Sequence, residues 1–179
     1  MILGCVLAGG QSTRFGSDKA LAELGGHTLL ARAVDTLSGW CEYVVVVGRE
    51  TAPAPTLPDW PAPGRGPLGG IAAALHLARD EGYVAVLTIG VDSIGLPDNL
   101  PQMLSPAPAF LEAQPVVGLW PASAAGPIEA ILSGDGRHSM LAFAKAIGAI
   151  PVKLAAEPAN INTAADLAAL QNPIWGETP

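Results

Sequence analysis

The chain has 179 residues, of which 50% are apolar and 14% are charged, and its formal net charge is −7. This length and hydrophobicity predict one compact domain with its own core and exclude disorder for most of the chain. The acidic balance argues against nucleic acid as a partner, because binding to a phosphate backbone requires a basic surface.

Cysteine use and apolar stretches narrow the class of protein further. The two cysteines, Cys5 and Cys41, form no CxxC pair, so neither a zinc site nor a disulfide framework is expected. The N-terminus lacks the pattern of a signal peptide, and the longest apolar stretch, 83–91, is too short to span a bilayer. We therefore expect a cytoplasmic protein without a membrane partner, as a monomer or a weak homo-oligomer.

The first half of the chain alternates between strand and helix patterns. Strands are predicted at Ile2–Ala8, Tyr43–Val47 and Tyr83–Gly90, and helices at Thr28–Leu37 and Pro67–Ala78. This order is typical of right-handed βαβ units, so we expect an α/β fold with a mostly parallel sheet.

The second half is less regular. Strands are predicted at 115–119 and 150–154, and helices at 127–132, 139–146 and 164–170. Thr163 and Asp166 have the spacing of a capping box at the start of the last helix. We expect a single domain over residues 1–171 and a loose tail over 172–179.

A glycine-rich segment follows the first predicted strand. Gly9 and Gly10 permit an unusual backbone there, and successive N–H groups can form a nest for an anion. Arg14 and Lys19 then add a forked cation and a point charge, a combination that suits a polyphosphate. The segment matches neither the Walker A pattern nor GxGxxG.

Four segments together resemble one known family. The segment 7–20 reads LAGGQSTRFGSDKA and resembles the LAGGxSxRMGxDKA signature of the MobA-type molybdenum cofactor guanylyltransferases, within the nucleotidyltransferase superfamily. Residues 66–70 resemble the family's GPLxG segment, residues 92–97 its DxPxLP segment and residues 160–167 its N[IV]NTxxDL segment. The resemblance implies a three-layer, Rossmann-like nucleotidyltransferase fold that transfers GMP from GTP to molybdopterin with release of pyrophosphate.

The resemblance also assigns roles to residues of the first and third motifs. It implies that the nucleotide is bound by Leu7, Ala8, Gly9, Gly10, Lys19 and Asp92. It also implies that Arg14 and Lys19 are catalytic because they offset charge on the leaving pyrophosphate, and that Asp92 is catalytic and holds Mg²⁺. Taken alone, Asp92 could equally cap the turn after its strand. Ser93-Ile94 departs from the family's pattern, which has a proline two residues after the aspartate.

The remaining assignments concern the base and the acceptor. By resemblance, Asp59 accepts hydrogen bonds from the base, and Arg137, Asn160 and Asn162 bind the second substrate. The residues alone leave other interpretations open: an exposed loop aspartate, a solvated arginine and two turn asparagines.

Two alternatives to guanylyl transfer remain open at this point. One is a cytidylyltransferase or another nucleotidyltransferase that acts on a small phosphorylated acceptor. The other is a nucleotide-binding paralogue without catalysis, which the altered Ser93-Ile94 step motivates.

Overall fold

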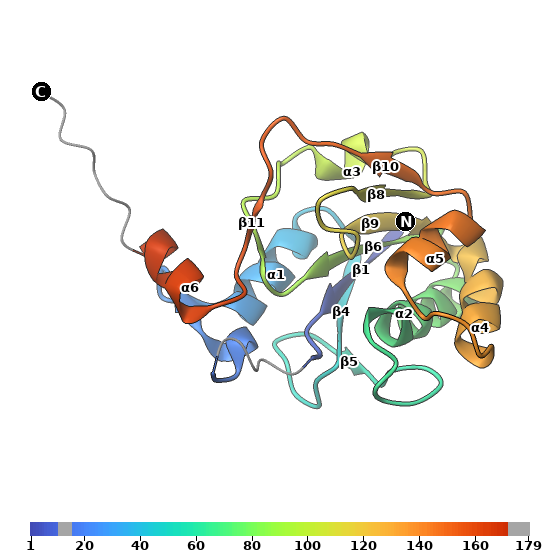
Figure 1. Cartoon of the computed structure of the whole chain (residues 1–179), viewed down its shortest axis with the longest axis horizontal. Coiled ribbons are helices and arrows are strands. Elements are labelled where there is room, and N and C mark those ends of the chain that lie inside the picture. Colours follow the sequence, from blue (N-terminus) through green and yellow to red (C-terminus); the bar gives the residue numbers. More distant parts are fainter. Residues whose placement is uncertain (11–15, 172–179) are drawn as a thin grey trace, which may run out of the picture.

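The computed structural model describes residues 1–10 and 16–171 (Figure 1). The elements up to the middle of the chain are β1 (Ile2–Leu7), the 3₁₀ helix η1 (Lys19–Leu21), β2 (Glu23–Leu24), β3 (His27–Thr28), α1 (Leu29–Ser38), β4 (Tyr43–Val47), β5 (Thr56–Leu57), α2 (Pro67–Glu81) and β6 (Ala85–Gly90). The remainder are β7 (Ser93–Ile94), α3 (Leu100–Met103), β8 (Ala109–Leu111), β9 (Gly118–Pro121), the 3₁₀ helix η2 (Ala122–Ala124), α4 (Ala125–Ser133), α5 (Met140–Ala146), β10 (Ile150–Val152), β11 (Ala159–Asn160) and α6 (Ala164–Gln171).

Seven strands form the central sheet in the order β10-β8-β9-β6-β1-β4-β5. Strand β9 runs antiparallel to both of its neighbours, and every other pair in this sheet is parallel, which confirms the mostly parallel sheet. In the register, Leu7 at the end of β1 lies opposite Val47 of β4 and Gly90 of β6. The three strands therefore end at the same level, and the loops that follow them lie at one edge of the sheet.

Each face of the sheet is covered by helices, which gives the predicted three layers. Helices α2, α4 and α5 share one buried apolar cluster, and α1, α3 and α6 contribute to the other (Figure 1). Along β6 the side chains alternate between the two clusters, with Val86 in the first and Leu87 in the second. The almost continuously apolar pattern of this strand, interrupted by Thr88, thus follows from burial on both faces.

The second half of the chain differs from the expectation in one strand pair. Strand β8 was not expected, and residues 115–117 of the predicted strand form the connection between β8 and β9. This connection is tight: Val117 N donates to Gln114 O at 2.8 Å, and Leu111 N donates to Val117 O at 2.8 Å. Strand β8 has three residues and follows Pro108, so its apolar run is too short for a period to be read.

The last helix begins with the expected capping box. Thr163 N donates to Asp166 Oδ2 at 2.8 Å, and Asp166 N donates to Thr163 Oγ1 at 3.1 Å. These bonds satisfy backbone N–H groups that have no partner within the helix. The tail expected at 172–179 lies outside the described residues. Within residues 1–10 and 16–171, no helix is both long enough and apolar enough to cross a membrane.

Candidate active site

The backbones of β1 and β4 make a close contact where the two strands end. Gly48 has φ +84°, and a Cβ atom added to it would overlap the Cα and N atoms of Gly9. A Cβ atom on Gly9 would in turn lie 3.2 Å from the Cα of Gly48. Gly48 therefore needs to be glycine because of its dihedral angle, and both Gly9 and Gly48 need to be glycine because their backbones lie so close together.

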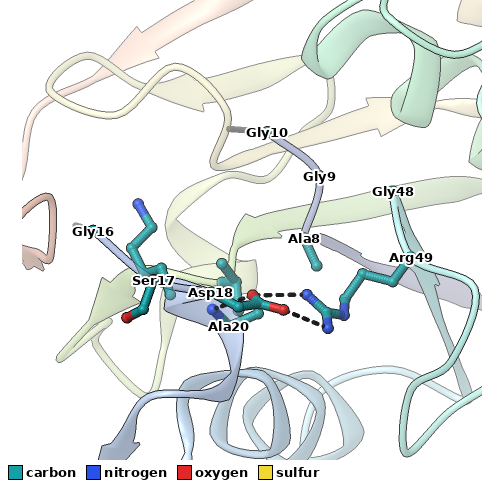
Figure 2. A pocket seen from close by; sticks show the side chains of 11 residues that line it. Ala8, Gly9, Gly10, Gly16, Ser17, Asp18, Ala20, Gly48 and Arg49 are labelled. Carbon is teal, nitrogen blue, oxygen red and sulfur yellow. Dashed lines mark hydrogen bonds and ion pairs between the residues drawn. The ribbon is translucent and has the colours of Figure 1, made fainter. Parts of the chain in front are cut away.

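Two adjoining cavities open at this edge of the sheet. The larger, of about 720 Å³, lies between the ends of β1 and β4 and the segment around η1 (Figure 2). Its lining residues are Ala8, Gly9, Gly10, Gly16, Ser17, Asp18, Lys19, Ala20, Gly48, Arg49 and Val91. The second, of about 370 Å³, shares Gly9, Gly10 and Gly48 with the first and extends to Leu7, Asp59 and the start of α2. The predicted nucleotide-binding residues Leu7, Ala8, Gly9 and Gly10 thus all line this pair of cavities.

An ion pair joins two of the predicted catalytic residues at this edge. Lys19 Nζ lies 2.8 Å from Asp92 Oδ2, and the two side chains are 18% and 22% exposed. Lys19 is the first residue of η1, and Asp92 follows β6 after one intervening residue. A Cβ atom on Gly90 would lie 2.6 Å from Asp92 Oδ1, so this glycine leaves room for the carboxylate.

A second ion pair in the larger cavity was not expected from the sequence. Arg49 donates from Nη1 and Nη2 to the two carboxylate oxygens of Asp18, at 2.9 and 2.8 Å (Figure 2). Asp18 Oδ1 also accepts from Ala20 N at 3.2 Å and so caps η1. The hydrogen bonds from Arg49 lower the pKa of Asp18 below its usual range, and the same bonds raise the pKa of Arg49.

The Asp18–Arg49 contact fixes the position of Lys19. It ties the segment immediately before η1 to the end of β4, so Lys19, the first residue of η1, is held near the sheet. The two partners are 31 positions apart in the sequence. No local pattern indicates such a pairing, which explains why the sequence did not predict it.

Asp59 lines the second cavity and not the first. A Cβ atom on Gly69 would lie 3.3 Å from the Cβ of Asp59, so this glycine lets the aspartate lie against the first turn of α2. The next residue, Trp60, donates its backbone N–H to Gly69 O at 3.0 Å. Asp59 is half-buried, and this burial raises its pKa.

The asparagine segment near the C-terminus lies beside Asp92. Strand β11 pairs antiparallel with β7, so that Asn160 lies opposite Ser93. Ile161 N also donates to Asp92 O at 3.2 Å. Asn160 and Asn162 are exposed near the backbone of Asp92, although they lie 68 and 70 positions after it in the sequence.

Of the last two predicted site residues, the structure describes only Arg137, and it does not line the two cavities. Arg137 is exposed in the connection between α4 and α5, and none of the described residues that line the two cavities comes from that connection. Arg14 lies outside the described residues. The roles of both residues remain predictions.

The carboxylate of Asp92 suits a cation that substrate phosphates also bind. Among residues 1–10 and 16–171, no group of three or more His, Cys, Asp or Glu side chains is arranged to hold a metal ion. Mg²⁺ is commonly bound by one or two carboxylates together with substrate phosphates. Asp92, with the space that Gly90 leaves around its carboxylate, fits that kind of site.

Comparison with known proteins identifies the family. Residues 4–149 match the model of the MobA-like NTP transferase domain. The chain belongs to this family. The chain is 36% identical to the molybdenum cofactor guanylyltransferase of Acidiphilium cryptum (strain JF-5), and the alignment covers 93% of this chain and 92% of that relative. The molybdenum cofactor guanylyltransferase of Rhodobacter capsulatus is 33% identical, over 99% of both chains.

Solved structures of low sequence identity share the fold of the MobA-like chain. The molybdopterin-guanine dinucleotide biosynthesis protein A from Archaeoglobus fulgidus superposes with a TM-score of 0.73, at 19% identity, over 94% of this chain and 96% of that chain. A nucleotidyl transferase from Methanothermobacter thermautotroptrophicus also gives a TM-score of 0.73, at 17% identity, over 96% of both chains. The predicted family and fold class are therefore confirmed.

Proposed function

We propose that this MobA-like protein transfers GMP from GTP to molybdopterin, which forms the guanine dinucleotide cofactor and releases pyrophosphate. The observation that carries the proposal is the pair of adjoining cavities: Asp59 lines one, and Lys19, which forms the ion pair with Asp92, lines the other. Relatives that are named molybdenum cofactor guanylyltransferase and align over nearly the whole chain support the same choice of substrates.

Asp59 supplies the selectivity for guanine in this proposal. Guanine presents N1–H and an exocyclic amino group on one edge, and a carboxylate accepts from both. Cytosine has no such pair of donors. Because Asp59 is half-buried, part of its hydration is already lost, and two donors from the base restore the hydrogen bonds that water supplied.

The phosphates occupy the larger cavity. Gly9 and Gly10 are exposed just after β1 and line both cavities, and we assign their backbone N–H groups to the triphosphate. Lys19 lies at the same edge as a point charge for the β- and γ-phosphates, and Arg14 is the second cation that we assign to them. Asp92 is the residue that would hold Mg²⁺, which supplies neutralisation of phosphate charge when it is bound.

The reaction itself needs no protein nucleophile. A phosphate oxygen of molybdopterin forms a bond to the α-phosphorus of GTP, the bond between that phosphorus and the bridging oxygen breaks, and pyrophosphate leaves with the electron pair. The protein aligns the acceptor with the α-phosphorus and stabilises the charge that develops on the leaving group. Asn160 and Asn162, which the fold places beside Asp92, are the residues that we assign to the acceptor.

Pyrophosphate release tests this function. The protein is incubated with Mg²⁺ and GTP, CTP, ATP or UTP, with and without molybdopterin. Release that requires both GTP and molybdopterin, and that EDTA abolishes, is the expected result. Equal or faster release with CTP would contradict the role of Asp59, and no release with any nucleotide would contradict the proposed enzyme.

A further inference from the structure

A buried side-chain amide lies behind the segment that carries Asp92. Gln114 is 7% exposed, and its neighbour Ser93 is 8% exposed. Among the described residues, buried polar side chains are rare; Thr88 is the third that the core contains. A buried amide is costly unless its donors and acceptor are paired, so its partners indicate what it holds together.

The amide of Gln114 bonds to two different segments. Ser93 Oγ donates to Gln114 Oε1 at 2.7 Å, and Gln114 Nε2 donates to Pro158 O at 3.1 Å. The carbonyl of Pro158 can only accept, which sets the direction of the amide, and Ser93 must then be the donor. One side chain thus bridges the residue next to Asp92 and the residue that precedes β11.

The backbone of Gln114 is held by the sheet. Gln114 N donates to Leu111 O at 3.2 Å, and Gln114 O accepts from Val117 N at 2.8 Å, within the connection between β8 and β9. The amide therefore projects from a fixed turn of the central sheet. The two segments that it bonds, by contrast, pair with each other in a separate sheet of two strands, β7 and β11, which have two residues each.

The segments that Gln114 bridges are the two that flank the acceptor in the proposed reaction. Asn160 lies opposite Ser93, and Ile161 N bonds to Asp92 O. Position 94 has isoleucine where the family pattern has proline, so no ring restricts the backbone φ angle there. At the neighbouring residue, Ser93, the hydrogen bond from its hydroxyl group to Gln114 Oε1 restrains the segment instead.

We propose that Gln114 is a positioning residue for the acceptor: it keeps the Asp92 segment and the Asn160–Asn162 segment in one fixed arrangement through Ser93 and Pro158. This inference rests on the proposed function, because it assigns the two segments to the metal and the second substrate. It does not extend to the nucleotide, because none of the described residues lining the two nucleotide cavities bonds to Gln114.

Substitutions that match Gln114 in size separate its hydrogen bonds from its volume. Gln114→Glu keeps an acceptor for Ser93 but faces the Pro158 carbonyl with a second acceptor, and Gln114→Met keeps the volume and removes both bonds. Ser93→Ala removes the bond on the Asp92 side alone. The control is Thr88→Val, since Thr88 is equally buried, bonds to Trp120 Nε1 at 2.9 Å and Val116 O at 2.6 Å, and contacts neither segment by a side-chain hydrogen bond.

Steady-state kinetics then distinguish positioning from stability. For Gln114→Glu and Gln114→Met we expect the KM for molybdopterin to rise by about tenfold while the dissociation constant for GTP, measured by calorimetry, stays within about twofold. Thr88→Val is expected to lower the melting temperature to a similar extent without a change in that KM. Equal changes in GTP affinity and acceptor KM, or an equal KM change in Thr88→Val, would overturn the proposal.

Hydrogen–deuterium exchange gives a readout that does not depend on the reaction. In Gln114→Glu and Ser93→Ala we expect the amide of Ile161 and its neighbours in β7 and β11 to exchange at least about tenfold faster, while β1 and β4 keep their protection. Unchanged exchange at Ile161 would overturn the proposal even if activity fell. A wild-type protein that releases no pyrophosphate with molybdopterin would instead overturn the proposed function, and the exchange result would still decide whether Gln114 links the two segments.

Discussion

Lys19 and Asp92 form an ion pair of 2.8 Å between the segments that follow β1 and β6. These strands are neighbours in the sheet, and Leu7 lies opposite Gly90, so the two segments start at the same level. The pair therefore follows from the topology of the sheet. In the proposed reaction a triphosphate gives Lys19 a second anionic partner, and Asp92 becomes available to a metal ion.

Removal of either member of this pair is expected to abolish transfer and leave the fold intact. For Lys19→Ala and Asp92→Asn we expect turnover to fall by about 10²–10³-fold, the usual effect of losing one preorganised charge at a reacting phosphate. Pyrophosphate release measures turnover, and circular dichroism checks the fold. Lys145→Ala, an exposed lysine on α5, is the matched control and should keep full activity. Near-wild-type turnover in either site variant would contradict the assignment.

Asp59→Asn is expected to lower the preference for GTP. The amide retains one acceptor but places a donor opposite the donors of guanine, so GTP affinity should weaken by about thirtyfold, equivalent to about 2 kcal/mol. Calorimetric titration with GTP and CTP measures the ratio of the two affinities. Asp35→Asn, an exposed aspartate on α1, serves as the control. An unchanged ratio in Asp59→Asn would show that another group recognises the base.

The raised pKa of Asp59 gives GTP binding a pH dependence of definite sign. Burial disfavours the charged carboxylate, so on acidification Asp59 takes up its proton at a higher pH than an exposed aspartate does. The protonated group accepts hydrogen bonds from guanine less well. The GTP affinity of the wild-type protein, divided by that of Asp59→Asn, should therefore fall as the pH is lowered. A ratio of the two affinities that stays constant down to pH 4 would argue against Asp59 as the acceptor.

The Asp18–Arg49 pair gives folding stability a pH dependence of its own. The folded-state pKa of Asp18 lies below the ordinary value of 3.8, chiefly through hydrogen bonds from Arg49. Its contribution to stability is therefore present above the ordinary value and is lost as the pH falls through the folded-state pKa. Wild-type protein should melt at a higher temperature than Asp18→Asn at neutral pH, and the difference should shrink below pH 3.8. A difference that is constant or grows toward low pH would contradict the pairing.

Gly48→Ala tests the close contact between β1 and β4. The added methyl group overlaps Gly9, and alanine disfavours φ +84°, so we expect a loss of about 2 kcal/mol in the free energy of unfolding and weaker GTP binding. Gly126→Ala is the control, because no atom lies within 4 Å of its added Cβ in helix α4. Urea denaturation should show Gly126→Ala to be as stable as wild type or more stable. Equal stability in the two variants would contradict the contact.

The sequence predicted the elements whose burial leaves a clear pattern. Strand β6 is apolar except for Thr88 because α1 and α2 cover its two faces, and α2 begins at Pro67 because proline suits the first turn of a helix. Strand β8 left no such pattern, since three residues between a proline and a turn are too few to show a period.

The site was predictable where a motif carries its own chemistry. Gly9, Gly10 and Lys19 were predicted because glycines and charges just after a first parallel strand suit a phosphate. The role predicted for Asp92 came from the resemblance to the family. Arg49 and Gln114 were missed because each acts through a partner that is distant in the sequence, Asp18 for one and Ser93 and Pro158 for the other. Pairings of this kind are consequences of the sheet order, which a single sequence does not reveal.

The most direct test of the account is the mass of the product. The wild-type protein is incubated with Mg²⁺, molybdopterin and equal concentrations of GTP and CTP, and the pterin product is analysed by mass spectrometry. We predict a product heavier than molybdopterin by one GMP unit, with pyrophosphate formed in equal amount. A product that carries CMP, or molybdopterin recovered unchanged from a folded protein that binds GTP, would contradict the account.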